Sequence, residues 1–257
     1  MSKYKQLLIL IFTFTLVFSL TPYSSSAHPA VRFKDRAYYE ERGDIVWEVP
    51  TEEKYIALTF DDGPDHRQTM QILEVLDQYN AKATFFVVGE RVEKYPEIIQ
   101  MELARGHEIG NHSYRHPSFR GLAKSKMHDE LSKTQQAILQ ATGYKASIFR
   151  PPGGFYNETI INVSKQNDLK LILWSWHLDT KDWTSPGVDK IVSNVIKNAR
   201  NGNIILMHDY VANSTQTVEA LKRILPELKK QGYSFITVSD LLAHKVEPYH
   251  KLRKVIQ

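Results

Sequence analysis

A regular alternation of short strand-like runs with longer segments of helical periodicity most constrains the fold. Seven runs are typical of strands, at residues 55–60, 83–88, 107–112, 147–150, 169–176, 203–208 and 233–238. Helical patterns follow them, at about residues 68–79, 95–105, 123–142, 158–166, 188–199 and 217–230, with a last turn near residue 241. Apolar strands that alternate with amphipathic helices indicate a parallel sheet covered by helices. We therefore predict an α/β fold, first as a closed or nearly closed barrel and second as an open doubly wound sheet.

The N-terminus differs from this repeating centre. Residues 1–27 begin with Lys3 and Lys5, continue with the uncharged apolar run 7–20 and end with small residues up to Ala27. This order is typical of a signal peptide. We predict export with cleavage after Ala27, and therefore a secreted or cell-wall location. An uncleaved membrane anchor is the alternative, although the run is short for a bilayer span.

The remaining boundaries follow from composition. Residues 28–50 are charged and irregular, and we predict an N-terminal extension there. The α/β domain is predicted to span residues 51–245, and residues 246–257 are predicted to be a short basic C-terminal tail.

Charge and cysteine usage exclude several classes of protein. Removal of residues 1–27 lowers the net charge from +4 to +2, because the segment carries two lysines and no acid. A mildly basic chain without a clustered basic stripe does not resemble a nucleic-acid binder, so we expect no nucleic-acid partner. The chain has no cysteine, which excludes a disulfide framework and thiolate catalysis. We expect a monomer.

Ionisable side chains gather just after five of the seven predicted strands. In parallel α/β folds, catalytic groups lie beyond the C-terminal ends of the strands. The residues at these ends are Asp61 and Asp62, His112 and His116, Arg150, Asp179 with Asp182 and Trp183, and His208 with Asp209. A barrel would bring them to one mouth.

The two histidines at spacing i, i+4 are a weak metal signal by themselves. Together with a carboxylate from another strand end, His112 and His116 become a zinc-type His–His–Asp set that leaves a coordination position for water. The adjacent Asp61 and Asp62 could instead belong to an ordinary turn, since Asp, Gly and Pro favour turns. That interpretation does not explain the other strand ends. In a metal site of this kind, one aspartate binds the ion and the other stays free as a base.

For three further residues the sequence allows two interpretations each. Arg150 is either a surface residue or, if buried, needs an anion that Asp61 or Asp182 could supply. Trp183 is either a core residue or the wall of a sugar or acyl pocket. His208 is either a core histidine or a catalytic one.

Five ordered segments resemble the motifs of a known family. TFDDG (59–63), HSYRH (112–116), RPPGG (150–154), DTKDW (179–183) and LMHD (206–209) resemble those of the polysaccharide deacetylases. These are the NodB-homology, chitin-deacetylase-like enzymes of carbohydrate esterase family 4. The resemblance covers residues 51–245 and implies a distorted (β/α) barrel with about seven parallel strands. It also implies a metal-dependent hydrolase that removes N-acetyl groups from an aminosugar polysaccharide.

The resemblance implies a role for each matching residue. Asp61 would be the general base, and Asp62, His112 and His116 would be the metal ligands. Arg150 would orient Asp61, Asp182 would tether Arg150 or His208, and His208 would be the general acid. Trp183 and Leu206 would line the acetyl pocket. The backbone N–H of Gly153 would help to hold the oxyanion, although many members have Tyr at that position.

The substrate and the metal have alternatives. Peptidoglycan N-acetylglucosamine is the first expected substrate and chitin oligomers are the second. The expected metal is Zn²⁺, although Co²⁺ or Ni²⁺ could serve. The chain could also be an O-acetyl esterase acting on xylan, or a non-catalytic wall-binding protein of the same fold. A non-catalytic copy would be expected to lack one of the acid, base or ligand residues, and all of them are present.

Overall fold

The computed structural model describes residues 34–212 and 214–246. The predicted signal peptide and all but the first residue of the predicted basic tail lie outside the described residues. The chain forms two units, residues 1–34 and residues 35–257, and the fold is that of the second unit.

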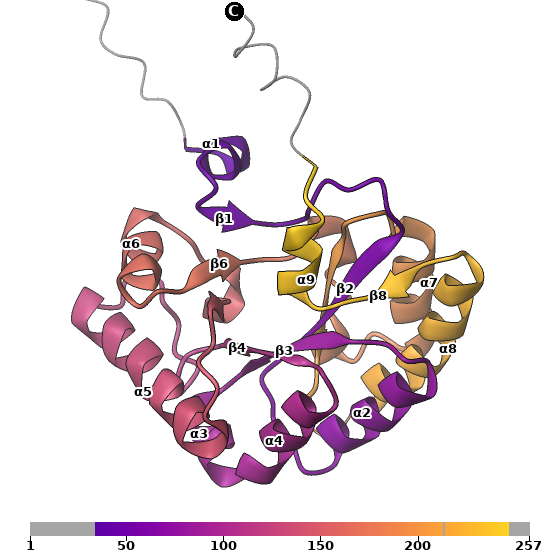
Figure 1. Cartoon of the computed structure of the whole chain (residues 1–257), viewed down its shortest axis with the longest axis horizontal. Helices are drawn as coiled ribbons and strands as arrows, with labels where there is room; N and C mark the ends of the chain where they lie inside the picture. Colours follow the sequence, from indigo (N-terminus) through magenta and orange to yellow (C-terminus); the bar gives the residue numbers. More distant parts are fainter. Residues whose placement is uncertain (1–33, 213, 247–257) are drawn as a thin grey trace, which may run out of the picture. The chain divides into compact units, whose positions relative to one another are not determined.

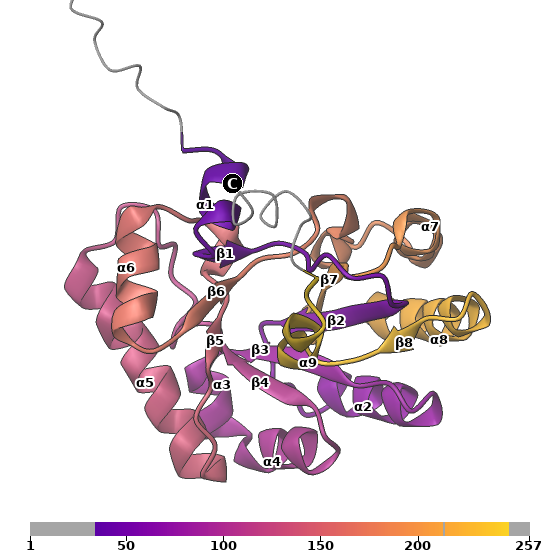
Figure 2. The same ribbon diagram turned by 45° about the horizontal axis from the view of Figure 1, so that its top comes forward.

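Eight strands form one sheet in the described part of the chain. They are β1 (Ile45–Val46), β2 (Tyr55–Asp61), β3 (Ala83–Val87), β4 (Glu108–Asn111), β5 (Ile148–Phe149), β6 (Lys170–Ile172), β7 (Ile204–His208) and β8 (Ser234–Phe235). The order is β1-β6-β5-β4-β3-β2-β7, and β8 pairs with the start of β2. Every pairing between these strands is parallel. Figure 2 shows the strands following one another in a curl.

The segment that follows β6 contacts β7 through hydrogen bonds and an isolated bridge. These contacts connect the two sides of the curled sheet. The Ser175 N–H donates to the carbonyl of Ile204 at 2.9 Å, and Asp179 forms an isolated parallel bridge with Leu206. The sheet is therefore a distorted (β/α) barrel, which confirms the first prediction over the open doubly wound sheet. The seven predicted strands are all present, and β1 is an addition.

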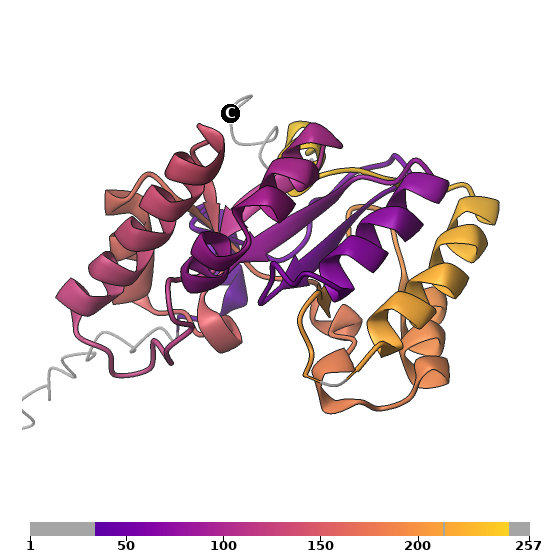
Figure 3. The same ribbon diagram turned by 90° about the horizontal axis from the view of Figure 1, so that it is seen from below.

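Helices cover the outside of the strands. They are α1 (Arg36–Glu41), α2 (Gln68–Gln78), α3 (Gly89–Lys94), α4 (Pro96–Ala104), α5 (Lys124–Thr142), α6 (Glu158–Gln166), α7 (Val188–Asn198), α8 (Gln216–Lys230) and α9 (Val238–Ala243). Figures 1 and 3 show α2 to α8 along the outer side of the sheet. No helix among the described residues is both long and apolar enough to cross a bilayer.

The predicted irregular extension is ordered in its described part. Residues 34–50 contain α1 and β1, and β1 pairs with β6. The Asp35 side chain caps α1 by accepting from the Tyr38 N–H. Trp47 is fully buried, so this segment contributes to the core of the domain. A two-residue strand among charged residues is too short to produce a periodic pattern, which is why the sequence did not indicate it.

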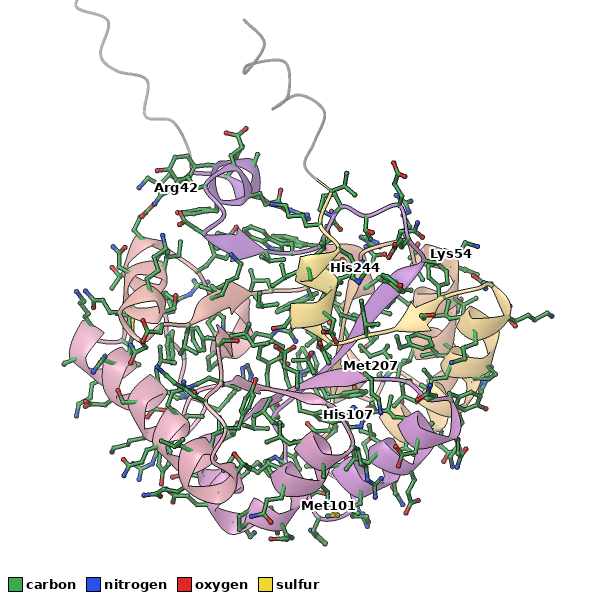
Figure 4. All side chains as sticks on the ribbon, viewed as in Figure 1. Arg42, Lys54, Met101, His107, Met207 and His244 are labelled. Atoms are coloured by element: carbon green, nitrogen blue, oxygen red, sulfur yellow. The ribbon has the colours of Figure 1, made fainter. Side chains whose placement is uncertain are left out.

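Strand alternation sorts the side chains into an outer and an inner layer. In β2, Ile56, Leu58 and Phe60 belong to the large core between the strands and the outer helices. Ala57 belongs to the smaller cluster inside the barrel. Figure 4 shows side chains filling both spaces. Asp61 follows the same alternation and therefore lies on the inner side of β2.

Helix α9 closes the N-terminal end of the barrel. Its residues Val238 and Leu241 join the inner cluster. The Val238 N–H donates to Thr84 Oγ1 at 2.9 Å, and the Ser239 N–H donates to Glu108 Oε2 at 3.1 Å. Because Thr84 and Glu108 lie at the starts of β3 and β4, the closed end is the one where strands begin. The opposite end carries the candidate site.

Candidate active site

A pocket of about 300 Å³ lies at the C-terminal ends of the strands. Its walls come from segments that are far apart in the sequence but adjacent in the barrel. They are Asp61, Asp62, His112, His116, Gly153, Gly154, Trp174, Asp179, Trp183, Leu206 and His208. Of the residues that the sequence singled out for the site, Arg150, Asp182 and Asp209 are missing from this wall. Each of the three hydrogen-bonds to a residue of the turn or wall: Arg150 to Asp61, Asp182 to His208 and Asp209 to Gly63.

Three of these residues form a group that fits a divalent metal ion. Asp62, His112 and His116 place one potential ligand atom each within 4.8 Å of one another. Asp62 Oδ1 lies 3.4 Å from His112 Nε2 and 3.3 Å from His116 Nε2. This oxygen is buried and has no hydrogen-bond partner among the described residues, a costly arrangement that a cation relieves. Two imidazole nitrogens and one carboxylate oxygen are the donors of a catalytic zinc-type site.

The orientation of His112 leaves the correct nitrogen for an ion. His112 Nδ1 lies 2.7 Å from the backbone oxygen of Arg150. A carbonyl oxygen only accepts, so Nδ1 carries the hydrogen, and the Nε2 lone pair of the neutral ring is free to bind a metal. A fixed tautomer of this kind is typical of metal-binding histidines.

The backbone around the ligands is held in an uncommon conformation. Asp62, Ser113 and His116 have positive φ angles of 77°, 67° and 55°, which non-glycine residues rarely adopt. Side chains stabilise this path, because Asn111 Oδ1 accepts from the Ser113 N–H at 2.9 Å and Ser113 Oγ accepts from the His116 N–H at 3.1 Å.

Helix α5 contributes a second support for the same loop. Glu130 Oε2 accepts from the Tyr114 N–H at 2.8 Å and from the Arg115 N–H at 2.7 Å. These two amides lie between the candidate ligands His112 and His116. The loop is therefore shaped by protein contacts before any ion binds.

The electrostatics of the group favour an ionised carboxylate. Burial alone would raise the pKa of Asp62, but the close approach and positive charge of His112, with the charges of His208 and His116, hold this pKa well below its usual range. Asp62 is therefore available as an anionic ligand across the neutral pH range.

Asp61, the neighbouring carboxylate, is held by a buried arginine. Arg150 is fully buried and donates from Nη1 to Asp61 Oδ1 at 2.7 Å and to Thr59 Oγ1 at 2.8 Å. Its Nη2 donates to the Leu173 carbonyl at 2.9 Å, and its guanidinium lies 4.1 Å from the centroid of the Phe86 ring. Of the two anions that the sequence offered to Arg150, the structure places Asp61 beside it.

Asp182 pairs with His208 instead. Asp182 Oδ1 lies 2.7 Å from His208 Nδ1, and Oδ2 accepts from the His208 N–H at 2.8 Å and from Thr217 Oγ1 at 2.6 Å. Burial lowers the pKa of His208, but the hydrogen bond and charge of Asp182, with Asp61 and Asp62, outweigh it and raise the pKa to about 9. His208 is therefore a protonated imidazole at neutral pH, with Nε2–H as its remaining donor.

Asp209 supports the site from the other side of β7. Its Oδ1 accepts from the Gly63 N–H at 2.9 Å and its Oδ2 accepts from Thr69 Oγ1 at 2.6 Å. A Cβ at residue 63 would lie 1.9 Å from Asp209 Oδ2, so only glycine fits there. The turn after Asp62 is thus fixed by Asp209, which the sequence analysis named only among the ionisable residues at the strand ends.

The remaining pocket walls are apolar or backbone. Trp183 is 57% exposed and lines the pocket, so it is a wall residue and not a core residue. Leu206 is buried and also lines the pocket, and Gly153 has φ 65°, a conformation that suits glycine. Trp174 and Gly154 also line the pocket and were not predicted. The apolar run 169–176 predicts Trp174 to be part of a strand, whereas β6 ends at Ile172.

The polysaccharide deacetylase family model matches residues 48–172. A peptidoglycan-N-acetylglucosamine deacetylase from Bacillus cereus is 47% identical over 216 residues, which are 82% of this chain and 98% of that protein. The chain belongs to the polysaccharide deacetylase family. This confirms the resemblance of the five segments.

Solved structures of related enzymes have the same fold. A peptidoglycan N-acetylglucosamine deacetylase is 33% identical with a TM-score of 0.75, and the match covers 82% of this chain and 98% of that one. A family 4 acetyl xylan esterase from Clostridium thermocellum, in complex with a cobalt ion, is 38% identical with a TM-score of 0.70 over 74% and 91% of the two chains. This polysaccharide deacetylase thus combines a metal-type group, a held carboxylate and a His–Asp pair in one pocket.

Proposed function

We propose that this polysaccharide deacetylase removes N-acetyl groups from the N-acetylglucosamine units of peptidoglycan, with Zn²⁺ as its metal. The observation that carries the proposal is the placement of Asp61, the metal-type group and His208 around one pocket. The names of the Bacillus cereus relative and of the solved structure above support peptidoglycan as the substrate. Cobalt fits the same nitrogen and oxygen donors, and so does nickel.

Asp62, His112 and His116 are the residues that would hold the ion. A divalent metal in this group supplies Lewis-acid chemistry, since it lowers the pKa of a water molecule and polarises the acetamide carbonyl. Asp61 is the proton acceptor in the proposal. Arg150 keeps one of its oxygens occupied and fixes the direction of the other, Oδ2, which lies 3.7 Å from His112 Nε2.

His208 is the proposed general acid. As the C–O bond to the attacking water forms and the C–N bond breaks, the departing nitrogen takes a proton from His208 and leaves as an amine, with acetate as the other product. Asp182 keeps His208 protonated for this step and fixes its ring. General acid and base groups each contribute roughly 10²- to 10⁴-fold to rate.

The proposal assigns the pocket walls to the acetyl group. Trp183 and Leu206 would contact its methyl group, and the backbone N–H of Gly153 would donate to the oxygen on which negative charge develops. Glycine at residue 153 provides this N–H without a side chain over the pocket.

We also propose that residues 1–27 direct export, that the mature protein is secreted or wall-associated, and that it is a monomer. The sequence pattern of residues 1–27 supports the first two statements. Mass spectrometry of the protein made in a bacterium would give His28 as the first residue. A chain that retains residue 1 in the membrane fraction would favour the anchor instead.

Acetate release tests the function directly. The metal-loaded protein is incubated with peptidoglycan, chitin oligomers and acetylated xylan, with and without a chelator. We expect the highest rate on peptidoglycan, and loss of this rate with chelator or with His112→Ala, which also lowers bound metal. His244→Ala, an exposed histidine outside the pocket, is the control. Release from xylan alone would identify an O-acetyl esterase, and no release from any substrate would identify a binding protein.

A further inference from the structure

Two helices at the pocket end of the barrel begin with the same pair of residues, a glutamine followed by a threonine. Helix α2 follows β2 and begins with Gln68 and Thr69, and helix α8 follows β7 and begins with Gln216 and Thr217. Both threonines are buried. Each donates its hydroxyl to a carboxylate oxygen at 2.6 Å, and the two acceptors are different, fully buried aspartates.

Thr69 connects Asp209 to the turn that follows the candidate metal ligand Asp62. Its hydroxyl donates to Asp209 Oδ2 and accepts from the Asp65 N–H at 2.7 Å. Asp209 Oδ1 accepts from the Gly63 N–H at 2.9 Å. The turn is therefore held at two amides, at residue 63 by Asp209 directly and at residue 65 through Thr69.

Thr217 supports the other half of the site, the pair of Asp182 and His208. Its hydroxyl donates to Asp182 Oδ2, and Asp182 Oδ1 lies 2.7 Å from His208 Nδ1. The Trp183 N–H also donates to Asp182 Oδ1, at 3.0 Å. A buried carboxylate keeps one orientation when donors fill its acceptor directions. Thr217 donates from the first turn of α8 and so anchors the pair to a helix.

We propose that Thr69 and Thr217 are positioning residues that hold the two halves of the site separately. Thr69 acts on the turn that carries the metal-type group, and Thr217 acts on the proton donor His208. The hydrogen bonds described for Thr69 and those described for Thr217 share no residue. Each hydroxyl can therefore be removed without breaking the bonds of the other. The Thr217 half of the inference rests on the proposed function, in which His208 is the general acid.

The test removes one hydroxyl at a time from the full chain. Valine has nearly the shape of threonine, with a methyl group in place of the hydroxyl. We expect Thr69→Val to lower the affinity for Zn²⁺ about tenfold, in a titration against a competing chelator, as loss of an outer partner predicts. Thr217→Val should leave this affinity as it is. It should lower kcat on a soluble peptidoglycan fragment by about tenfold or more at saturating Zn²⁺, with KM unchanged, because a misplaced acid fails in the transition state.

Matched variants separate the hydroxyl from the packing. Thr69→Ser and Thr217→Ser keep the hydroxyl without the methyl group and should restore most of each property, which a role in packing alone would not allow. Thr142→Val is the control, since Thr142 donates to the Ile138 carbonyl in α5, outside the pocket. Thr69→Ala or Thr217→Ala takes the place of a valine variant that does not fold.

A spectroscopic readout distinguishes this inference from the proposed function. The Nδ1–H proton of His208, bonded to Asp182, should give a low-field NMR signal that Thr217→Val shifts and Thr69→Val leaves in place. If the unaltered protein releases no acetate, the proposed function fails, and the Zn²⁺ affinities and this signal still test the two threonines. Equal effects of the two valine variants on Zn²⁺ affinity, or serine variants no better than the valine variants, would overturn the inference.

Discussion

Arg150 and Asp61 share a buried contact in which Nη1 donates to Oδ1 at 2.7 Å. The other oxygen of Asp61, Oδ2, is directed to the side of His112. The two oxygens of this carboxylate therefore differ: Arg150 holds Oδ1, and Oδ2 is the oxygen that the proposed function assigns to proton transfer. The division depends on Arg150 being fixed by three further acceptors, which are Thr59 Oγ1 and the carbonyls of Leu173 and, at 3.4 Å, Ile172.

Arg150→Met should destabilise the protein strongly. The substitution leaves Asp61 buried without its cation, and breaking a buried pair in this way costs about 3–5 kcal/mol in the free energy of unfolding. Urea unfolding measures this loss. Arg115→Met, which removes an exposed pair with Glu90, is the matched control and should cost less than about 1 kcal/mol. Similar losses in both variants would contradict the importance of the buried pair.

Asp61→Asn should separate catalysis from metal binding. The amide oxygen can still accept from Arg150, but the group no longer takes a proton, so kcat should fall by roughly 10²- to 10⁴-fold. Bound metal, measured by mass spectrometry after dialysis, should stay the same because Asp62, His112 and His116 are intact. Asp62→Asn should instead lower bound metal. Activity near that of the unaltered protein in Asp61→Asn would rule out its role as the base.

Asp182→Asn should move the alkaline limb of the pH–rate profile to lower pH. In the unaltered protein His208 has a raised pKa of about 9, so it stays a proton donor up to that pH. Without the carboxylate, burial lowers this pKa, and the donor is lost earlier as the pH rises. The profile of kcat/KM against pH reports the shift. Asp189→Asn, at an exposed pair with Arg223, should leave the limb in place.

Glu130→Ala should weaken metal binding without touching a ligand. It frees the Tyr114 and Arg115 amides and with them the loop between His112 and His116. Loss of an outer partner of this kind typically costs 10- to 100-fold in metal affinity. Titration with Zn²⁺ against a competing chelator measures the affinity. Glu93→Ala is the control, because Glu93 accepts from the Tyr114 hydroxyl and, among the described residues, from no backbone amide of the loop. Glu130→Gln should recover part of the loss.

The periodic elements of the fold could be predicted from the sequence. The strand before Asp61 and the long helix α5 have clear patterns because each is buried along a regular face. The six-residue α3 and the two-residue β1 are too short for a period to be visible. Tertiary contacts stabilise these short elements, as the burial of Trp47 directly after β1 illustrates.

The site residues that could be predicted from the sequence are those at or just after the ends of predicted strands. Alternation along a parallel strand places Asp61 at the mouth, but it does not say whether Arg150 or His208 pairs with Asp182. That choice depends on which strands are neighbours. Glu130 left no signal, since an acid on an amphipathic helix resembles a solvated residue. Its role depends on the path of a loop that precedes the helix.

The closure of the barrel by α9 has a consequence for the order of assembly. The hydroxyl of Thr84 and the carboxylate of Glu108 find their backbone partners only when Val238 and Ser239 arrive. On a ribosome these partners emerge more than a hundred residues after Glu108. Until then Thr84 and Glu108 have each other as partners, at 2.8 Å, but the apolar residues of the inner cluster lack the cover of α9. The inner core of the barrel is therefore completed only after α9 has been synthesised.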